Sequence, residues 1–353
     1  MGAIRRGRTA GTRGGLGRVA AMVVGLALVL MLAMVGEARA GTYRVAQCGW
    51  GVGAELDPTV SPTTGTAFSL DASTCPAPPG AVAGMKLEGA VASDGLLGQA
   101  RARWIAPSGT RFAGVHLVWV GNLQTGFWEG LGVEGGGLYH LLEYAFTGVG
   151  PGVVDLPIEG QAWAFEAFVQ CFLGGPEIDC VRSTPSTMRV SAIVFVLEDQ
   201  QPPQARLGGT LAAAGWHRGT VPLELAAADL GAGVAGETAT IDGAPVLTAA
   251  PTCAARLIEN EVRATRMQPC PSTSTGSAEV DTTRLADGAH ALGGCATDFA
   301  GDQGCGPGVQ IEVDNSPPAV TFVGGGEGQV AAKVSDRYSG PGAGTISMRR
   351  SDA

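Results

Sequence analysis

The sequence predicts an all-β protein built from sandwich modules, and three observations indicate this fold class. Gly accounts for 56 of the 353 residues, about twice its average usage, while charged residues make up only 16% of the chain. Gly and Pro separate short runs that are rich in Val, Thr and aromatic residues. No long stretch places apolar residues at the i, i+3, i+4 and i+7 positions of an amphipathic helix. We therefore expect antiparallel β-sandwiches rather than an α/β enzyme.

A repeated connector divides the chain into modules. Residues 314–318 read Asp-Asn-Ser-Pro-Pro and echo residues 199–203, which read Asp-Gln-Gln-Pro-Pro. The two prolines fix φ and remove two backbone donors, so a strand must end there and a stiff, extended segment must begin. The repeat continues after each connector, because residues 228–233 are answered by residues 335–340. A unit that recurs at roughly a hundred residues is typical of tandem modules.

These connectors set the domain boundaries that we expect. They are an export segment at 1–40, a large first sandwich at 41–199, a second sandwich at 200–316, and an incomplete third repeat or disordered tail at 317–353. A sandwich needs about 100 residues, so the third repeat is too short to form one. We expect either a fragment or a disordered end whose strand edges are exposed.

The first 40 residues have the composition of an export signal. Arg5 and Arg6 begin a basic region, residues 19–35 form an apolar run, and Ala38-Arg39-Ala40 supplies a small-x-small cleavage pattern. The alternative is a membrane anchor, but a run of about 17 residues is at the short limit for crossing a bilayer. We expect cleavage after Ala40 by the general secretion route, and a location outside the cell or on its surface.

Removal of this segment makes the chain more acidic. It takes away six arginines and one glutamate, so the formal net charge falls from −9 to −14. An acidic surface repels nucleic acid and anionic membranes, and we expect neither as a partner. No second apolar segment of membrane length follows, so no membrane insertion is expected after cleavage.

The eight cysteines divide evenly between the first two modules. Those before the first connector are Cys48, Cys75, Cys171 and Cys180, and those between the connectors are Cys253, Cys270, Cys295 and Cys305. An even number in each module of an exported protein predicts disulfides within modules, with three possible pairings for each set of four. We favour nearest-neighbour pairing, namely Cys48–Cys75, Cys171–Cys180, Cys253–Cys270 and Cys295–Cys305. Zinc is the alternative, but no C-x-x-C pair and no histidine at ligand spacing supports it.

In the first module we expect strands at 43–47, 102–105, 114–120, 138–144, 162–171 and 188–197. Alternation along the third of these places Val115, Leu117 and Trp119 on one face, which we assign to the core. On the strand at 162–171, the same rule predicts a core face formed by Trp163, Phe165 and Ala167. The opposite face is then formed by Ala164, Glu166 and Phe168.

Landmarks in this module resemble a recurring bacterial exported architecture. They are Gly41-Thr42-Tyr43 and Cys48 directly after the cleavage site, and the run Trp-Ile-Ala-Pro-Ser-Gly-Thr at 104–110. In that architecture a jelly-roll, lectin-like domain precedes immunoglobulin-like modules. The resemblance spans most of residues 41–318 and implies a surface or secreted protein with an adhesive or carbohydrate-binding role.

The second module resembles bacterial immunoglobulin-like modules. We expect strands at 207–211, 220–227, 238–241, 278–281, 289–297 and 309–313. The family landmarks are Asp-x-Gly-x-Gly from Asp229, Asp-Gly-x-Pro-Val from Asp242, and Asp-x-Ala-Gly-Asp from Asp298. The usual asparagine after Ala-Gly is Asp302 here. The resemblance implies that this module spaces and presents functional domains, and a third repeat begins with expected strands at 319–323 and 329–334.

The sequence favours a protein that is not an enzyme. Glycoside hydrolases need two carboxylates facing one cleft, and on a strand these would lie two residues apart. The glutamates of the first module are dispersed instead, at Glu129, Glu134, Glu143, Glu159 and Glu166. His140-Leu141-Leu142-Glu143 is not a metalloprotease motif, and neither Gly-x-Ser-x-Gly nor a Walker loop occurs.

A ligand-binding patch is more plausible, and residues 122–129 are our candidate for it. This stretch reads as a loop that carries two large aromatic residues beside hydrogen-bonding side chains. The candidate binding residues are Asn122, Gln124, Phe127 and Trp128, with Tyr139 and Glu143 as neighbours. The alternative is that Phe127 and Trp128 are core anchors beneath a glycine-rich turn, since aromatic residues usually lie inside.

No cofactor is expected, although calcium remains an alternative at the module junctions. Asp229, Asp298, Asp302 and Asp314 are the oxygen donors that would be tested, since calcium needs several such ligands. They do not have EF-hand spacing, so Asx turns are the more economical account of these aspartates, and we assign no metal ligands.

Two functional readings follow. The first is an exported, non-catalytic protein that binds a glycan or a cell-envelope component through its first module. The second is a structural or adhesive immunoglobulin-like spacer that contacts surface proteins. Exposed aromatic rings beside polar groups would favour the first reading, and buried aromatic rings without a hollow would favour the second.

Overall fold

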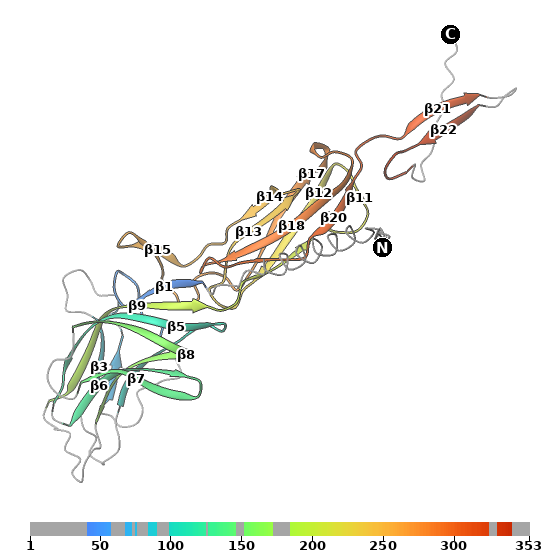
Figure 1. Ribbon diagram of the computed structural model, residues 1–353. Coiled ribbons are helices and arrows are strands. Elements are labelled where there is room, and N and C mark those ends of the chain that lie inside the picture. Colours follow the sequence, from blue (N-terminus) through green and yellow to red (C-terminus); the bar gives the residue numbers. More distant parts are fainter. Residues whose placement is uncertain are drawn as a thin grey trace, which may run out of the picture. The chain divides into compact units, whose positions relative to one another are not determined.

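The structure is a computed structural model that describes residues 41–57, 68–72, 75, 84–89, 99–124, 126–145, 152–171, 184–324 and 330–340. These residues belong to one compact unit that spans Ala40–Ala353. The expected export segment at 1–40 lies outside the described residues. No helix among the described residues is long and apolar enough to cross a membrane. The fold is all-β, as predicted from the sequence (Figure 1).

Within the described residues, nine strands build the first module. They are β1 (Thr42–Gln47), β2 (Phe68–Asp71), β3 (Met85–Gly89), β4 (Gln99–Ile105), β5 (Thr110–Asn122), β6 (Phe127–Gly135), β7 (Leu138–Ala145), β8 (Val153–Cys171) and β9 (Ser186–Asp199). The six expected strands of this module correspond to β1, β4, β5, β7, β8 and β9. Sequence reasoning missed β2 and β3, and it interpreted the start of β6 as part of a loop.

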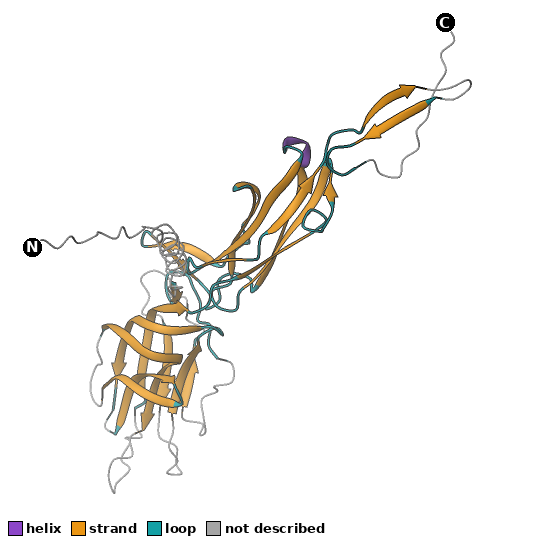
Figure 2. Ribbon diagram, turned by 45° about the vertical axis from the view of Figure 1, so that its right-hand side comes forward, coloured by secondary structure: helices purple, strands orange, loops and turns teal. Residues whose placement is uncertain are grey.

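Strand β8 takes part in two layers of the first module. Its first half pairs with β5, from Val153 to Pro157, and its second half pairs with β4 and β6, from Ala162 to Cys171. The first layer therefore runs β1-β9-β5-β8, and the second contains β4, β8, β6 and β7. Strands β2 and β3 extend the first layer through β9. Figure 2 shows the strands of the two layers wrapped around a common interior.

An aromatic cluster fills this interior and joins the two layers. Phe195 on β9 contacts Trp104, Phe112 and Phe165, with ring centroids 5.4, 5.0 and 5.1 Å away and edge-to-face geometry. Phe195, Phe112, Phe165 and Trp104 are all fully buried. The expected core face of Val115, Leu117 and Trp119 is confirmed, because all three belong to the same cluster of buried residues.

The second module is a sandwich of two sheets. One sheet has the order β10-β12-β17, and the other has β11-β20-β18-β13-β14 with β19 paired to β18. Its strands are β10 (Gln204–Gly208), β11 (Trp216–His217), β12 (Thr220–Ala228), β13 (Val234–Ile241), β14 (Ala244–Ala249), β17 (Thr273–Asp281), β18 (Gly288–Asp298), β19 (Gln303–Cys305) and β20 (Val309–Val313), with one 3₁₀ turn at Thr282–Arg284. Leu223, Leu225, Ile241, Leu292 and Ile311 form the centre of its core.

A hairpin from within residues 200–316 joins the sheet of the first module. It consists of β15 (Ala255–Ile258) and β16 (Glu261–Ala264), and β16 lies parallel to β1 at the pair Val45 and Ala264. The Tyr43 hydroxyl donates to the backbone carbonyl of Met267 at 2.8 Å. Ala264 and Met267 are buried in the core of the first module. The two sandwiches therefore share a sheet and part of a core.

After the second connector, β21 (Ala319–Gly324) and β22 (Ala331–Ser335) form an antiparallel hairpin. The side chain of Trp216 contacts Tyr338 just beyond the hairpin, with ring centroids 6.1 Å apart. Most side chains of β21 and β22 are exposed or half-buried. The hairpin thus buries little apolar surface of its own.

Three of the four expected disulfides are present: Cys48–Cys75, Cys253–Cys270 and Cys295–Cys305. Cys180, the expected partner of Cys171, lies outside the described residues. Cys253–Cys270 spans the β15–β16 hairpin, so it closes the segment that reaches the first module.

Replacement of Phe195 by alanine should destabilise the first module strongly. It removes the ring that contacts three other buried aromatic rings, and a cavity of this kind costs about 3–5 kcal/mol in the free energy of unfolding. Urea unfolding of residues 41–353, followed by tryptophan fluorescence, measures the loss. Phe322→Ala is the matched control, because this phenylalanine is exposed on β21 and should cost no more than about 0.5 kcal/mol. Equal losses in the two variants would contradict the assigned core.

Candidate functional site

The stretch at 122–129 is not the exposed aromatic loop that the sequence suggested. Asn122 ends β5, and Phe127 and Trp128 begin β6, so only residues 123–126 connect strands. Phe127 is 1% exposed and lies in the core. Trp128 is half-buried and packs edge-on against Phe168, with ring centroids 4.8 Å apart. The interpretation of residues 122–129 as a loop with two exposed rings was wrong, because β6 begins at Phe127, directly after Gly126. The alternative, that these rings are core anchors, is confirmed for Phe127.

The other candidate binding residues are divided between two places. Asn122 is exposed, and the backbone N–H of Gln124 donates to Ser186 Oγ at 2.9 Å. Tyr139 and Glu143 lie on β7, where Tyr139 is opposite Glu134 of β6. Six residues of strand separate Trp128 from Glu134, which is about 20 Å. The structure therefore does not bring Tyr139 to the residues at 122–129.

Trp163 lies beside Tyr139 instead, on the outer face of the second layer. We expected Trp163 on the core face with Phe165 and Ala167, and those two residues are indeed buried there. Trp163, however, is 44% exposed. The pairing between β6 and β8 shifts register at Glu134, whose partner is Ala164, and Gly135, whose partner is Ala162. This bulge leaves Trp163 without a partner on β6 and turns its side chain outward.

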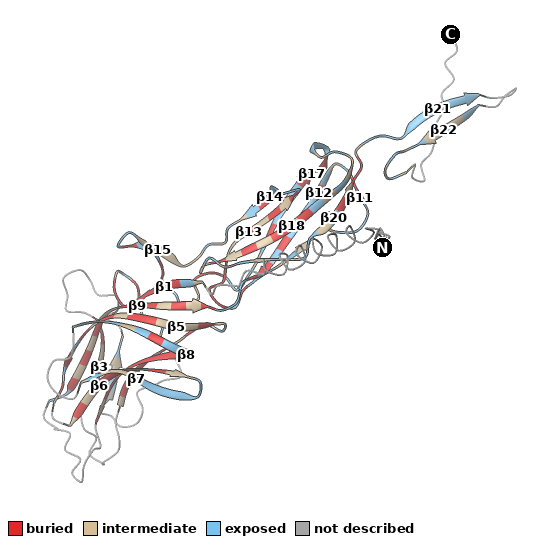
Figure 3. Cartoon of the chain, in the orientation of Figure 1, coloured by how far each residue is buried: buried red, intermediate tan, exposed pale blue. Residues whose placement is uncertain are grey.

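Trp163 and Tyr139 flank a shallow hollow, which we call the Trp163–Tyr139 surface. The hollow has a volume of about 260 Å³, and its lining consists of Glu134, Gly135, Gly137, Leu138, Tyr139 and Trp163. Strand β7 supplies further exposed apolar side chains at Leu138, Leu141 and Tyr144, and most of it is coloured as exposed in Figure 3. A group of exposed apolar side chains rimmed by charge is typical of a binding surface.

Tyr139 is held at its hydroxyl end and open along its ring. A Cβ at Gly132 would overlap the Tyr139 hydroxyl, so the side chain lies across the sheet at a position that only glycine allows. Burial of the hydroxyl, together with the nearby Glu166 carboxylate, raises the pKa of Tyr139 well above its ordinary value. The tyrosine as a whole is nevertheless 46% exposed. It therefore remains neutral and presents ring surface to solvent.

Arg103, which belongs to a network of ion pairs, contacts the Trp163 ring. The guanidinium carbon of Arg103 lies 4.9 Å from the centre of the Trp163 ring, within the range of a cation–π interaction. Arg103 also contacts Glu134 at 2.5 Å and Glu166 at 3.4 Å, and Arg101 contacts Glu166 at 3.1 Å. Burial raises the pKa of Glu166, and the two arginines oppose that shift. The network fixes the ring of Trp163 against the sheet.

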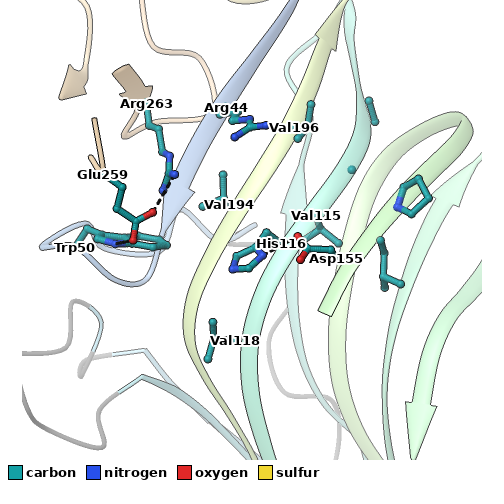
Figure 4. Close-up of a pocket in the computed structure, with 14 residues that line it drawn as sticks. Arg44, Trp50, Val115, His116, Val118, Asp155, Val194, Val196, Glu259 and Arg263 are labelled. Carbon is teal, nitrogen blue, oxygen red and sulfur yellow. Dashed lines mark hydrogen bonds and ion pairs between the residues drawn. The ribbon is translucent and has the colours of Figure 1, made fainter. Parts of the chain in front are cut away.

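A larger groove of about 610 Å³ lies on the outer face of the first layer (Figure 4). Val118, Val194 and Val196 line it, and His116 Nδ1 lies 2.7 Å from Asp155 Oδ1. These residues come from β5, β8 and β9.

The other side of this groove is formed by Trp50 and by residues of the β15–β16 hairpin. Trp50 Nε1 donates to Glu259 at 3.2 Å, and Arg263 contacts Glu259 at 3.0 Å. Figure 4 shows the Arg263 side chain reaching toward Trp50, and its guanidinium carbon lies 5.4 Å from the ring centre. Glu259 thus bonds to Trp50 and Arg263, and His116 pairs with Asp155. We interpret the groove as the place where the hairpin is fastened to the sheet.

The sequence marks an interruption inside β8 but not the bulge that exposes Trp163. Pro157 and Gly160 interrupt the run that becomes β8, and Gly160 has a φ of +79°. Proline and glycine inside a strand mark bulges, after which the alternation restarts with a different phase. Trp163 follows both residues, however, and only Ala164 separates it from Phe165. Alternation counted backward from Phe165 therefore assigns Trp163 to the core face, and the sequence does not reveal the bulge at this position.

Comparison with known proteins assigns no family. No family model matches the chain, and no curated protein matches it. Among solved structures, the chain is 8% identical to the glycoside hydrolase domain of Endo-D from Streptococcus pneumoniae, covering 77% of this chain and 37% of that chain with a TM-score of 0.22. It is 10% identical to a GH2 beta-galacturonidase from Eisenbergiella tayi bound to galacturonate, covering 67% and 38% with a TM-score of 0.19. It is 12% identical to dimeric latent PorU from Porphyromonas gingivalis, covering 76% and 26% with a TM-score of 0.22.

The chain spans less than half the length of each of these solved chains. Identities and TM-scores of this size give no basis for transferring an activity. The function must therefore be argued from the residues of this chain.

Glu129, next to Trp128, is buried in an apolar setting. Its side chain points to the interior, where neither carboxylate oxygen has a hydrogen-bond partner among the described residues. A Cβ at Gly121 would overlap this carboxylate, which shows how tightly it is enclosed. Burial raises the pKa of Glu129 from 4.5 to about 7.

Glu129 should make the stability of the protein fall as the pH rises. The raised pKa favours the protonated form in the folded chain, so its contribution is complete below pH 4.5 and is lost as the pH rises to about 7. The shift corresponds to about 3 kcal/mol. Glu129→Gln should match the wild type near pH 4.5 and exceed it in the free energy of unfolding at pH 8, as measured by urea unfolding across that range. Glu279→Gln, at an exposed glutamate, is the control, and an identical pH profile for Glu129→Gln and wild type would contradict the assignment.

Proposed function

We propose that this protein is an exported, non-catalytic binding protein whose first module holds a glycan or cell-envelope component on the Trp163–Tyr139 surface. The observation that carries the proposal is the pair of half-exposed aromatic rings beside one hollow. Sugar rings have apolar faces that stack on such rings, and their hydroxyl groups need charged or polar partners nearby.

The geometry of the surface fits this kind of ligand. Both rings are fixed before any ligand arrives, Trp163 by Arg103 and Tyr139 by its position over Gly132. A prearranged site loses little conformational entropy on binding. Glu134 lines the hollow and accepts from Arg103, so it can also accept from a sugar hydroxyl. A volume of about 260 Å³ is below that of most enclosed ligand pockets and suits a short stretch of glycan on an open platform.

The carboxylates near the surface support binding rather than hydrolysis. Glycoside hydrolysis uses two carboxyl groups that both reach the glycosidic bond. Glu166 is 1% exposed and contacts Arg101 and Arg103, so it lies beneath the surface instead of facing a ligand. The described lining of the hollow contains a single carboxylate, that of Glu134.

Other parts of the chain support the setting of this proposal. The residues at 1–40 have the pattern of an export signal, and disulfides of the kind seen here are typical of proteins in oxidising compartments. We interpret the first module as the lectin-like domain of the bacterial exported architecture and the second as the immunoglobulin-like module that presents it. The shared β15–β16 hairpin would keep the binding surface fixed relative to that module.

A glycan array probed with residues 41–353 tests the proposal. We expect wild type to retain one class of glycan and Trp163→Ala to lose at least about tenfold in affinity, taking as a guide the range of about 1–3 kcal/mol for a nucleobase stacked on an aromatic side chain. Tyr139→Ala should weaken the same binding. Trp216→Ala is the matched control, since this tryptophan has a similar exposure but lies on the second module.

Two results would contradict the proposal. Binding that survives Trp163→Ala but is lost in Trp216→Ala would move the site to the second module. The absence of binding to any glycan or to isolated cell-wall material would favour the second reading, in which the chain is a spacer that contacts surface proteins.

A further inference from the structure

Three buried aspartates meet where the first module joins the second. Asp199 ends β9, Asp229 follows β12, and Asp298 ends β18. Each is nine-tenths or more buried. One carboxylate oxygen from each residue lies within 4.8 Å of those of the other two. The second module itself brings Asp229 and Asp298 together, and the docking of the two modules adds Asp199.

Backbone N–H groups hold each aspartate from one side. Ala232 donates to Asp199 Oδ2 at 2.6 Å, Gly233 donates to Asp229 Oδ2 at 2.6 Å, and Asp302 donates to Asp298 Oδ1 at 2.9 Å. The bonds to Asp229 and Asp298 come from N–H groups four residues later in the chain, within local turns. The bond to Asp199 comes from the other module, 33 residues away in sequence. These bonds account for one oxygen of Asp298 only.

The second carboxylate oxygen of Asp298 has no such hydrogen bond. Asp298 is 4% exposed, and its Oδ2 has no hydrogen-bond partner among the described residues. An unpaired buried charge costs several kcal/mol, so a folded chain normally gives it a partner. A side chain of this kind, within a group of three carboxylates, points to a cation.

Protein side chains do not supply that cation within the described part of the chain. None of the ion pairs found there involves Asp199, Asp229 or Asp298. Burial raises the pKa of Asp298 from 3.8 to about 7, and the carboxylates of Asp199, Asp302 and Asp229 add to this shift. The backbone N–H of Gly41 donates to Asp302 at 2.7 Å, so an α-ammonium formed there by export cleavage would serve Asp302 first.

The loop after β12, which contains Gly231, Ala232 and Gly233, lies very close to Asp199. A Cβ at Gly231 would overlap the carboxylate of Asp199, so only glycine lets this part of the second module reach the end of β9. The approach places the carboxylate of the first module directly against the two carboxylates of the second.

We propose that Asp199, Asp229 and Asp298 bind a calcium ion that fastens the first module to the second. All three donors are carboxylates, and the group contains no cysteine or histidine, which excludes the ligand sets preferred by zinc and copper. Calcium accepts irregular sets of oxygen ligands, whereas magnesium demands near-ideal octahedral geometry and keeps several waters. Backbone carbonyls and water would complete the coordination. The proposal is independent of the glycan site.

In contrast to Asp298, Asp314 in the second connector has a hydrogen-bond partner for each carboxylate oxygen. Asp314 Oδ1 accepts from the backbone of Ser316 and Oδ2 accepts from the backbone of Ser339, at 3.1 and 2.9 Å. Hydrogen bonds from the Ser339 side chain and backbone, and from the Ser316 backbone, hold the pKa of Asp314 below its ordinary value. The structure therefore does not group Asp314 with the other candidate calcium ligands. Asp199, which the sequence analysis did not name as a candidate, lies beside Asp229 and Asp298 instead.

Calcium titration of residues 41–353 tests the proposal. The protein is first freed of metal with EDTA, and isothermal titration calorimetry then measures the binding of calcium chloride. We expect one saturable site and a rise of about 5 °C or more in the unfolding midpoint at saturating calcium, because the ion binds the folded chain only. Asp298→Asn should lower the calcium affinity at least tenfold. In EDTA this variant should unfold no earlier than wild type, since it removes an unpaired charge.

Glu279→Gln is the matched control, because it removes one exposed carboxylate from the same module. It should bind calcium as the wild type does. Wild type without saturable calcium binding, or Asp298→Asn with unchanged affinity, would overturn the proposal. An equal rise in the unfolding midpoint with magnesium at the same concentration would overturn the assignment to calcium. The comparison of wild type with and without calcium remains decisive even if Asp298→Asn fails to fold.

Discussion

The path of strand β8 is the constraint on which the first module depends. Because one strand of 19 residues pairs with β5 in its first half and with β4 and β6 in its second, it fixes how the two layers face each other. The aromatic cluster around Phe195 lies between these halves. The bulge at the start of the second half turns Trp163 outward while Phe165, two residues later, stays in the core. The interior and the candidate binding surface thus have a common structural origin.

Contacts between residues far apart in sequence also determine how the two modules meet. The β15–β16 hairpin of the second module pairs with the sheet of the first. The second module also brings Asp229 and Asp298 to Asp199 at the end of β9. A connector with two prolines would by itself set only the direction of the chain. The hairpin, the Tyr43–Met267 hydrogen bond and the aspartate group add contacts across the junction that a simple string of modules lacks.

Local chemistry made much of this fold predictable from the sequence. The prolines at 202–203 and 317–318 follow strand ends as expected, and the short spacing of Cys295 and Cys305 matched a pair of neighbouring strands. The β15–β16 hairpin was not foreseen, because its place beside β1 depends on contacts between residues more than 200 positions apart. The exposure of Trp163 was missed for a different reason, since a bulge changes the phase of alternation without changing the composition of the strand. Asp199 was not grouped with Asp298 because nothing in their spacing along the chain relates them.

The central claim is that the bulge in β8 exposes Trp163, and solvent exposure of the six indole N–H groups tests it directly. Residues 41–353 labelled with ¹⁵N-tryptophan would give one indole signal for each of the six tryptophans. A neutral gadolinium chelate broadens the signals of groups that solvent reaches. The account predicts strong broadening for Trp163 and Trp216, and sharp signals for the buried Trp104 and Trp119. A Trp163 signal as protected as that of Trp104 would contradict the bulge, the Trp163–Tyr139 surface and the function proposed for it.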